Sequence, residues 1–140
     1  MFANNSFGRT LDILHRSMDV AALRQNVIAN NIANADTPNF KRSYVNFESQ
    51  LKAALESERA PRPLQARMTR ERHVPFTQPV DYRTVRPQRR LDYLTTTDNN
   101  GNNVDIEVES MNYLNNQLLY TLMTDTVNQQ FQRLNLVIRG

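Results

Sequence analysis

The chain has 140 residues, a length typical of one domain, and 39% of them are apolar, which is at the low side for a globular protein. It contains no cysteine, so disulfides, thiolate metal sites and cysteine nucleophiles are excluded. The net charge of +3 is unevenly spread: nine arginines and two acids lie between Arg59 and Arg90, and the rest of the chain is net negative. The sequence has no run of about 18 apolar residues, so we predict no membrane span. The N-terminus lacks the pattern of a secretory signal peptide, so export would need another route.

The first predicted element is a long helix over about residues 7–35. Apolar or small side chains recur there at alternating steps of four and three, which is the spacing of a coiled-coil seam. Pro38 must lie beyond the helix, because its ring disfavours helical backbone at Thr37. The seam consists of Phe7, Leu11, Leu14, Met18, Ala21, Ile28, Ile32 and Ala35, with Gln25 at the one remaining position.

The middle of the chain holds five of the six prolines and most of the arginines. Short apolar runs over 72–85 and 89–97 are typical of extended or weakly β segments. Residues 44–60 predict a short helix with one apolar face, formed by Phe47, Leu51, Ala54 and Leu55.

A second long helix is predicted after the turn signal DNNGNN at 98–103. Asp105, Glu107 and Glu109 place negative charge near its start, where the helix dipole favours it. One apolar stripe along this helix contains Met111, Leu114, Leu118 and Leu122. A seam with alternating steps contains Tyr113, Gln117, Tyr120, Thr124, Val127, Phe131, Leu134 and Ile138.

These elements predict a mainly α fold in which the two long terminal helices pack as a coiled-coil-like pair, with a Pro/Arg-rich extended or weakly β insert. We divide the chain into an N-terminal helix (1–36), an insert with the turn and short helix (37–103) and a C-terminal helix (104–140). The two stripes could be buried within one chain or against neighbouring copies. Because the seams are sustained and the insert offers few apolar groups, we favour neighbouring copies.

The sequence contains no catalytic or metal-binding pattern that we recognise. His15 and His73 are far apart and lack an acidic or histidine neighbour at metal spacing. P-loop, G-x-G-x-x-G, G-x-S-x-G and H-E-x-x-H motifs are missing. We therefore predict no enzyme activity, no metal and no cofactor.

The arginine-rich segment supports a rival interpretation. Together with Phe76, Tyr82 and Tyr93, these arginines could bind single-stranded nucleic acid through charge and base stacking. No zinc-finger or RRM signature accompanies them, and they could equally face the acidic surface of a protein. A third interpretation is a helical-hairpin adaptor that works as a monomer.

The stretch NNIANADTPNF, residues 30–40, closes the first helix and resembles the N-terminal signature of the flagellar axial proteins, which are the rod, hook and hook-associated subunits. In that family an apolar helix leads into Asn-Ile-Ala-Asn, two variable residues, Thr, a residue that is often Pro, then Gly and an aromatic residue. Residues 31–34 match, as do Thr37, Pro38 and Phe40. Asn39 stands where the family usually has Gly. Since Asn is the next-best residue for left-handed backbone, we expect the turn to persist.

Within this family the chain is most similar to the short rod proteins of the proximal rod, over about residues 7–47 and 100–140. Size, the Arg/Pro-rich middle and the segment that begins with GNNVD carry this similarity. Two short rod subunits are known, and we rank the second one lower because its middle tends to be longer.

The resemblance implies a structural subunit of the bacterial flagellar basal-body rod that polymerises helically through its terminal helices. The implied partners are self copies, other rod subunits, the rod-base adaptor protein, the membrane ring protein and the export gate, and no nucleic acid. The implied location is the periplasmic rod, reached through the type III export apparatus without a cleaved signal peptide.

Phe7 and Leu11 fit the export pattern of a Phe followed four residues later by an apolar residue. The expected signature turn is Thr37, Pro38, Asn39 and Phe40. The expected assembly interface is Leu11, Leu14, Met18, Ile28, Asn31, Ile32, Asn34, Leu118, Tyr120, Val127, Phe131, Leu134 and Ile138.

The asparagines at the end of the first helix suggest a physical role. Amides can cap carbonyls and bind neighbouring copies without repeating a fixed charge at every subunit. The alternative is that Asn34 is a simple C-terminal cap and that Asn30 is solvated. We also expect the helices of a free subunit to stay disordered until they dock.

Overall fold

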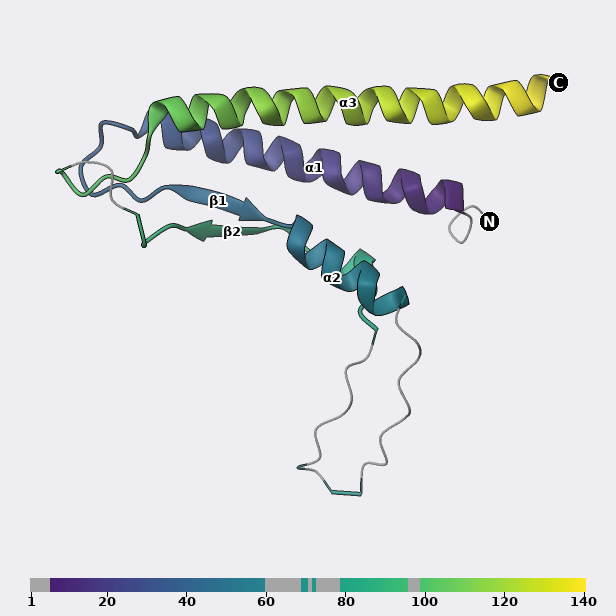
Figure 1. The fold of residues 1–140 in the computed structure, drawn as a ribbon, viewed down its shortest axis with the longest axis horizontal. Helices are drawn as coiled ribbons and strands as arrows, with labels where there is room; N and C mark the ends of the chain where they lie inside the picture. Colours follow the sequence, from purple (N-terminus) through teal and green to yellow (C-terminus); the bar gives the residue numbers. More distant parts are fainter. Residues whose placement is uncertain (1–5, 60–68, 71, 73–78, 96–98) are drawn as a thin grey trace. The chain divides into compact units, whose positions relative to one another are not determined.

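The structure is a computed structural model that describes residues 6–59, 69–70, 72, 79–95 and 99–140 (Figure 1). The mainly α fold with two long terminal helices is confirmed. Along the chain the elements are α1 (Ser6–Ala33), β1 (Ser43–Asn46), α2 (Glu48–Arg59), the 3-10 helix η1 (Tyr82–Thr84), β2 (Gln88–Leu91) and α3 (Ile106–Arg139). The chain divides into two compact units, the first formed by Met1–Val45 with Arg89–Gly140 and the second by Asn46–Gln88.

In the first unit α1 and α3 lie side by side and run in opposite directions (Figure 1). The seam predicted for α1 faces away from solvent: none of its residues is exposed, and Ala21, Ile28 and Ala35 are buried. Val20 and Val27 widen this face and are buried as well. The two helices therefore pair within one chain, so the preference for neighbouring copies was wrong for α1.

The end of α1 comes two residues before the predicted Ala35. Its last hydrogen bonds tighten, because the Asn34 and Ala35 N–H groups donate to the carbonyls of Asn31 and Ile32, three residues back, at 3.1 and 3.2 Å. Such tightening is the usual way in which a helix uses up its last carbonyls. The chain then enters the predicted turn.

The start of α3 is as predicted. Asp105 is the N-cap, and its Oδ1 accepts hydrogen bonds from the N–H groups of Glu107 and Val108 at 2.9 and 3.1 Å. Two N–H groups that a helix leaves without internal partners are satisfied in this way.

The first half of the seam predicted for α3 is not buried within the chain. Tyr113, Gln117 and Tyr120 are exposed, whereas Glu109 and Asn116 are the buried residues of this fully described helix. In the first half of α3 the residues that face α1 are therefore shifted by one residue from the predicted seam, as Asn116 is from Gln117. Polar partners across the helix pair determine this rotation, because Glu109 bonds to Asn31 and Asn116 bonds to the Ala21 carbonyl.

The strands form a two-stranded sheet, and their arrows run in opposite directions (Figure 1). β1 alternates in the manner of a half-buried strand, with Ser43 and Val45 buried and Tyr44 exposed. It occupies residues that we assigned to the short helix, which begins only at Glu48. β2 lies at the start of the run predicted to be weakly β.

The second unit contains α2 and η1. The expected apolar face of the short helix is present, with Phe47, Leu51 and Ala54 buried and Leu55 half-buried. Tyr82 is also buried, and its N–H donates to Glu58 Oε1 at 3.3 Å. Of the extended run predicted at 72–85, residues 73–78 lie outside the described residues, so His73 and Phe76 are not placed.

The predicted insert, 37–103, thus contains the whole second unit together with two flanking segments, 37–45 and 89–103, that belong to the first unit. Among the described residues, no helix is both long and apolar enough to span a membrane.

Candidate assembly interface

The turn that follows α1 has the backbone expected from its sequence. Asn39 has a φ of 60°, the left-handed conformation that Gly adopts most easily and Asn next. The Thr37 N–H donates to Asn34 O at 3.1 Å and the Phe40 N–H donates to Thr37 O at 3.3 Å. Thr37, Pro38 and Asn39 are exposed, whereas the Phe40 side chain is half-buried.

A second asparagine-rich loop holds this turn from inside. The buried Asn102 amide nitrogen lies within hydrogen-bond distance of three carbonyl oxygens, those of Asn34 (2.9 Å), Ala35 (2.7 Å) and Thr37 (2.8 Å). The Asn39 N–H in turn donates to a carbonyl of the same loop, at 3.1 Å. From the sequence we expected two separate turns. Their shared excess of asparagine was the signal that could have linked them.

Gly101 of this loop has a φ of +78°, and a Cβ at this position would lie 2.8 Å from Asn39 Oδ1. Its carbonyl accepts a 2.7 Å hydrogen bond from Lys41 Nζ. The positive φ therefore favours glycine here, and a larger residue would also have to displace the Asn39 side chain.

Asn31 connects three elements. Its amide nitrogen donates to Ser43 O of β1 at 2.8 Å and to Glu109 Oε2 of α3 at 3.0 Å, and its Oδ1 accepts from the Ser43 N–H at 3.0 Å. Glu109 also receives a 2.5 Å charge-assisted hydrogen bond from Arg42 Nε. Asn31 and Glu109 are both 0% exposed. Full hydrogen bonding and the Arg42 cation compensate for the cost of burying these polar groups.

Asn116 makes a second polar contact between the long helices. Its amide nitrogen donates to Ala21 O at 2.8 Å and to Gln25 Oε1 at 2.7 Å. Because Ala21 is small, the two backbones can approach closely at this level. Glu109 and Asn116 together determine which face of α3 turns toward α1.

The segment after β2 is held by Asp92. Its carboxylate accepts hydrogen bonds from the Leu94 N–H (3.0 Å) and the Thr95 hydroxyl (2.9 Å), with Arg42 further away at 4.0 Å. These hydrogen bonds favour the charged form, so they lower the pKa of Asp92 below its ordinary value. The bond from the Leu94 N–H is the largest cause, and the bond from the Thr95 hydroxyl is the second. Asn103 fixes the same segment by donating to Asp92 O at 2.7 Å.

Part of the remaining surface of α3 is apolar. The outer stripe, as we call Met111, Leu114, Leu118 and Leu122, is exposed along its whole length, with Leu118 60% exposed. Leu136, Val137 and Ile138 are exposed near the end of the helix, which extends past the start of α1 (Figure 1). Exposed apolar rows of this kind are typical of interaction surfaces.

The structure divides the predicted assembly residues by exposure. Exposed residues are Leu118, Tyr120, Phe131 and Ile138. Half-buried residues are Leu11, Leu14, Met18, Ile32, Asn34, Val127 and Leu134. Ile28 and Asn31 are buried inside the chain. Asn31 therefore has an internal role, and we no longer assign it to a contact with another copy.

The other asparagines match the simpler interpretation. Asn34 Nδ2 donates to Asn30 O at 2.8 Å, which caps the helix, and the Asn30 side chain is exposed. His15 does have an acidic neighbour, contrary to our expectation, because its Nδ1 lies 3.6 Å from Asp19 Oδ2 on the surface of α1. Within the described residues no group of three His, Cys, Asp or Glu side chains could hold a metal ion.

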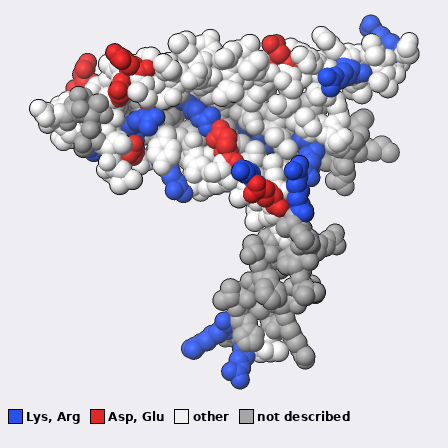
Figure 2. All heavy atoms as spheres, viewed as in Figure 1, with Lys and Arg blue, Asp and Glu red and all other residues white. Residues whose placement is uncertain are grey.

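Charged side chains are distributed unevenly over the surface (Figure 2). Acidic side chains gather where α3 begins, and Asp105 and Glu107 are among them. The arginine-rich segment is described only in parts, and there Arg83 lies over the Tyr82 ring at 5.6 Å.

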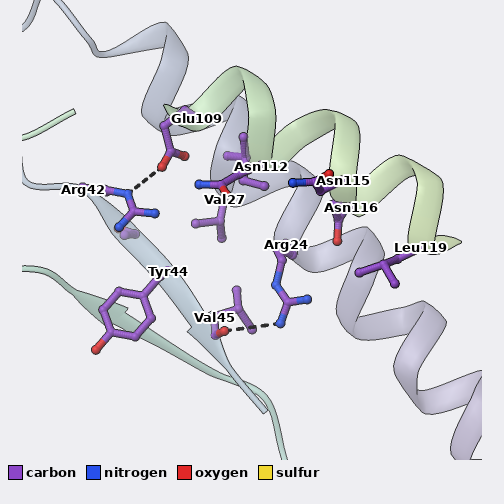
Figure 3. Close-up of a pocket in the computed structure, with 12 residues that line it drawn as sticks. Arg24, Val27, Arg42, Tyr44, Val45, Glu109, Asn112, Asn115, Asn116 and Leu119 are labelled. Atoms are coloured by element: carbon purple, nitrogen blue, oxygen red, sulfur yellow. Dashed lines mark hydrogen bonds and ion pairs between the residues drawn. The ribbon is translucent and has the colours of Figure 1, made fainter. Parts of the chain in front are cut away.

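A groove of about 270 Å³ lies between α1, β1 and α3 (Figure 3). Its floor contains the buried residues Val27, Ile28 and Val45, and its exposed rim includes Tyr44 and Leu119. The remaining lining residues are polar: Arg24, Arg42, Ser43, Glu109, Asn112, Asn115 and Asn116.

Comparison with known proteins identifies the family. Residues 11–41 match the family model described as flagella basal body rod protein. The chain is 44% identical over 135 residues to the flagellar basal body rod protein FlgB of Borrelia hermsii, covering 96% of this chain and 99% of the relative. FlgB of Bacillus subtilis is 34% identical with 96% of both chains covered, and FlgB of Escherichia coli is 31% identical with 89% and 88% covered.

The matched residues 11–41 contain most of α1 and the turn that Asn102 holds, and the relatives extend the similarity through α3. The chain therefore belongs to the FlgB family of flagellar basal body rod proteins.

Proposed function

We propose that this chain is a structural subunit of the proximal rod that polymerises helically through α1 and α3. In this role it links the membrane ring and the export gate to the rest of the rod. The observation that carries the proposal is the inverted character of α3, which buries Glu109 and Asn116 and exposes its apolar outer stripe.

The energetics favour covering the outer stripe. Burying apolar surface contributes about 25 cal/mol per Å², and four neighbouring large side chains offer several kcal/mol in total. α1 cannot cover the stripe, because α1 packs against a different face of α3, the one that contains Glu109 and Asn116. A neighbouring subunit can cover it, and a head-to-tail contact that does not close adds copies along a helix.

We assign the exposed Leu118, Tyr120, Phe131 and Ile138 to contacts with other subunits. The half-buried residues of the predicted interface border this surface or the pairing of α1 with α3. The further proposed partners are the other rod subunits, the rod-base adaptor, the membrane ring protein and the export gate. Membership in the rod protein family supports this set.

Export through the flagellar type III apparatus to a periplasmic rod is part of the same proposal, with Phe7 and Leu11 as the recognised pair. In the folded chain the Phe7 ring meets Phe131 edge-on, with ring centroids 6.3 Å apart. Recognition of Phe7 would therefore precede the pairing of the helices.

The test replaces two residues of the outer stripe, Leu118→Glu with Leu122→Glu. The matched control is Leu94→Glu, a change at an exposed leucine outside the long helices. In cells that lack their own copy, we expect the control to restore rods and motility and the double variant to fail. The purified double variant should keep the helical content of the parent. Rods that assemble normally with both charges present would refute the proposal.

The nucleic-acid and monomeric-adaptor interpretations remain sequence predictions. Salt-sensitive binding of single-stranded DNA would support the first. A monomer in sedimentation at all concentrations would support the second.

A further inference from the structure

We propose that Asn100 and Gly101 form a site of covalent self-modification, at which the folded chain converts its own Asn100 amide into aspartate and isoaspartate. Water is the only co-reactant. The site lies in the loop that holds the end of α1, and it does not depend on the proposed rod function.

An asparagine followed by glycine can form a cyclic imide, and Asn100–Gly101 is the one such step in the sequence. The Gly101 nitrogen loses its proton and forms a bond to Asn100 Cγ, while Asn100 Nδ2 leaves as ammonia. Glycine favours this attack because it has no Cβ to obstruct it. Water then opens the imide at one of its two carbonyls. Cleavage of the new bond gives aspartate, and cleavage of the original peptide bond gives isoaspartate.

The Asn100 side chain is folded back toward the nitrogen that would attack it. Its Oδ1 accepts a 3.0 Å hydrogen bond from the Asn102 N–H, so the side chain lies over the peptide bond between Asn100 and Gly101. Within the described part of the chain the Gly101 N–H forms no hydrogen bond, which leaves its nitrogen available. Asn100 is exposed, so water can enter and ammonia can leave. Holding the reacting groups together in this way favours cyclisation.

The two oxygen atoms that become negative during cyclisation both accept hydrogen bonds already. Loss of the Gly101 proton places charge on Asn100 O, because the peptide bond is delocalised, and this oxygen accepts from the Asn39 N–H at 3.1 Å. Attack on Cγ places charge on Oδ1, which the Asn102 N–H binds. Hydrogen bonds to charged oxygens are roughly twice as strong as those to neutral ones, so they stabilise the transition state more than the starting loop.

Lys41 adds a positive charge next to this peptide. Its Nζ donates a 2.7 Å hydrogen bond to Gly101 O. A cation close to the site favours the negative charge that develops there. The fold therefore supplies both the arrangement and the electrostatics that a free peptide of the same sequence lacks.

The modification would loosen the end of α1. Isoaspartate adds an atom to the main chain two residues before Asn102, whose amide nitrogen holds the carbonyls of Asn34, Ala35 and Thr37. It also adds a carboxylate to the loop that precedes the acidic start of α3. A modified chain should therefore hold its turn less tightly than a newly made one.

Incubation of the purified full chain in mildly alkaline buffer tests the site, with peptide mapping by mass spectrometry and enzymatic methylation of isoaspartate as the readouts. We expect Asn100 to lose its amide about tenfold faster than Asn99, an exposed neighbour in the same loop. The Asn100 rate should also be higher in the folded chain than in guanidinium. Asn100→Gln, which keeps an acceptor but would need a larger ring, should stay unmodified. A stable Asn100 amide, or a rate no higher in the folded chain than in guanidinium, would overturn the proposal.

Lys41→Gln tests the electrostatic contribution and should slow the conversion about threefold. The matched control is Lys52→Gln, at an exposed position of α2, which should leave the rate unchanged. Equal rates in the two variants would refute the role of Lys41. Hydrogen exchange in residues 31–40 should be faster in the isoaspartate fraction than in the unmodified chain, and equal exchange would refute the effect on the turn. Every measurement uses the purified chain, so a negative result leaves the rod role standing.

Discussion

The amide of Asn31 in α1 donates a 3.0 Å hydrogen bond to the carboxylate of Glu109 in α3, and neither side chain has exposed surface. Asn31 also exchanges two hydrogen bonds with the backbone of Ser43, so it pairs with β1 much as a neighbouring strand would. One uncharged side chain thus sets the register of two helices and a strand. A rod subunit must present the same outer surface in every copy, and this internal register is what makes that surface constant.

Replacing Asn31 by Ala should destabilise the chain by about 2–4 kcal/mol, because it leaves buried groups of Ser43 and Glu109 without partners. Because α1 and α3 pair within one chain, we now expect a folded free subunit in place of disordered helices. Urea unfolding of the purified protein, followed by circular dichroism, measures the loss of stability. Asn30→Ala, on the exposed side of the same helix turn, is the control and should change the free energy of unfolding by no more than about 0.5 kcal/mol. Equal effects of the two substitutions would contradict the internal role of Asn31.

Asn102→Ala should destabilise the end of α1, since three carbonyls lose the amide that satisfies them. We expect a loss of about 1–3 kcal/mol and faster hydrogen exchange in residues 31–40. Asn99→Ala, at an exposed position of the same loop, should have little effect. Unchanged exchange at the end of α1 in the Asn102 variant would show that the two loops do not depend on each other.

The left-handed backbone of Asn39 predicts a ranking of substitutions. Asn39→Gly should be tolerated within about 1 kcal/mol, because Gly adopts this conformation freely. Asn39→Val should cost about 1–2 kcal/mol or more, because a β-branched residue resists positive φ. Thermal unfolding of the three proteins tests the order. A valine variant as stable as the parent would mean that the turn adopts another conformation in solution.

Asp92 predicts a dependence of stability on pH. Its pKa is lowered in the folded chain, so the charged form contributes stability above the ordinary value of 3.8. That contribution is lost as the pH falls through the lowered folded pKa. Asp92→Asn should therefore reduce the melting temperature at pH 7, and the difference from the parent should shrink in strong acid. Asp125→Asn, at an exposed site, is the control. A carboxyl NMR titration of Asp92 with a midpoint at or above 3.8 would contradict the assignment.

Several features were predictable because their causes are local. Asp105 caps α3 through its own neighbours, Pro38 prevents α1 from continuing, and the backbone of Asn39 follows from the conformational range of asparagine. The seam of α1 was also predictable, because its apolar residues repeat without interruption. The strand β1 was missed, since Ser43–Asn46 is too short to show a pattern against the helix that follows.

The inward face of α3 was not predictable from periodicity, because the chain buries a glutamate and an asparagine there and exposes leucines. Hydrophobic patterning assumes that the apolar side turns inward. That assumption fails when the buried polar side chains have hydrogen-bonding partners within the chain, as Glu109 has in Arg42 and Asn31. It also fails when the apolar row is used by another molecule.

The amino-acid sequence by itself determined the two long helices, the turn after the first, and the family, since each depends on residues close together in the chain. The tertiary structure decided what the asparagines do. Asn31, Asn102 and Asn116 bind groups that are 12 to 95 residues away in the chain. An amide can donate or accept in any surroundings, so its type alone specifies no partner, and the partner is chosen only when the fold brings backbone and carboxylate groups within 3 Å of it.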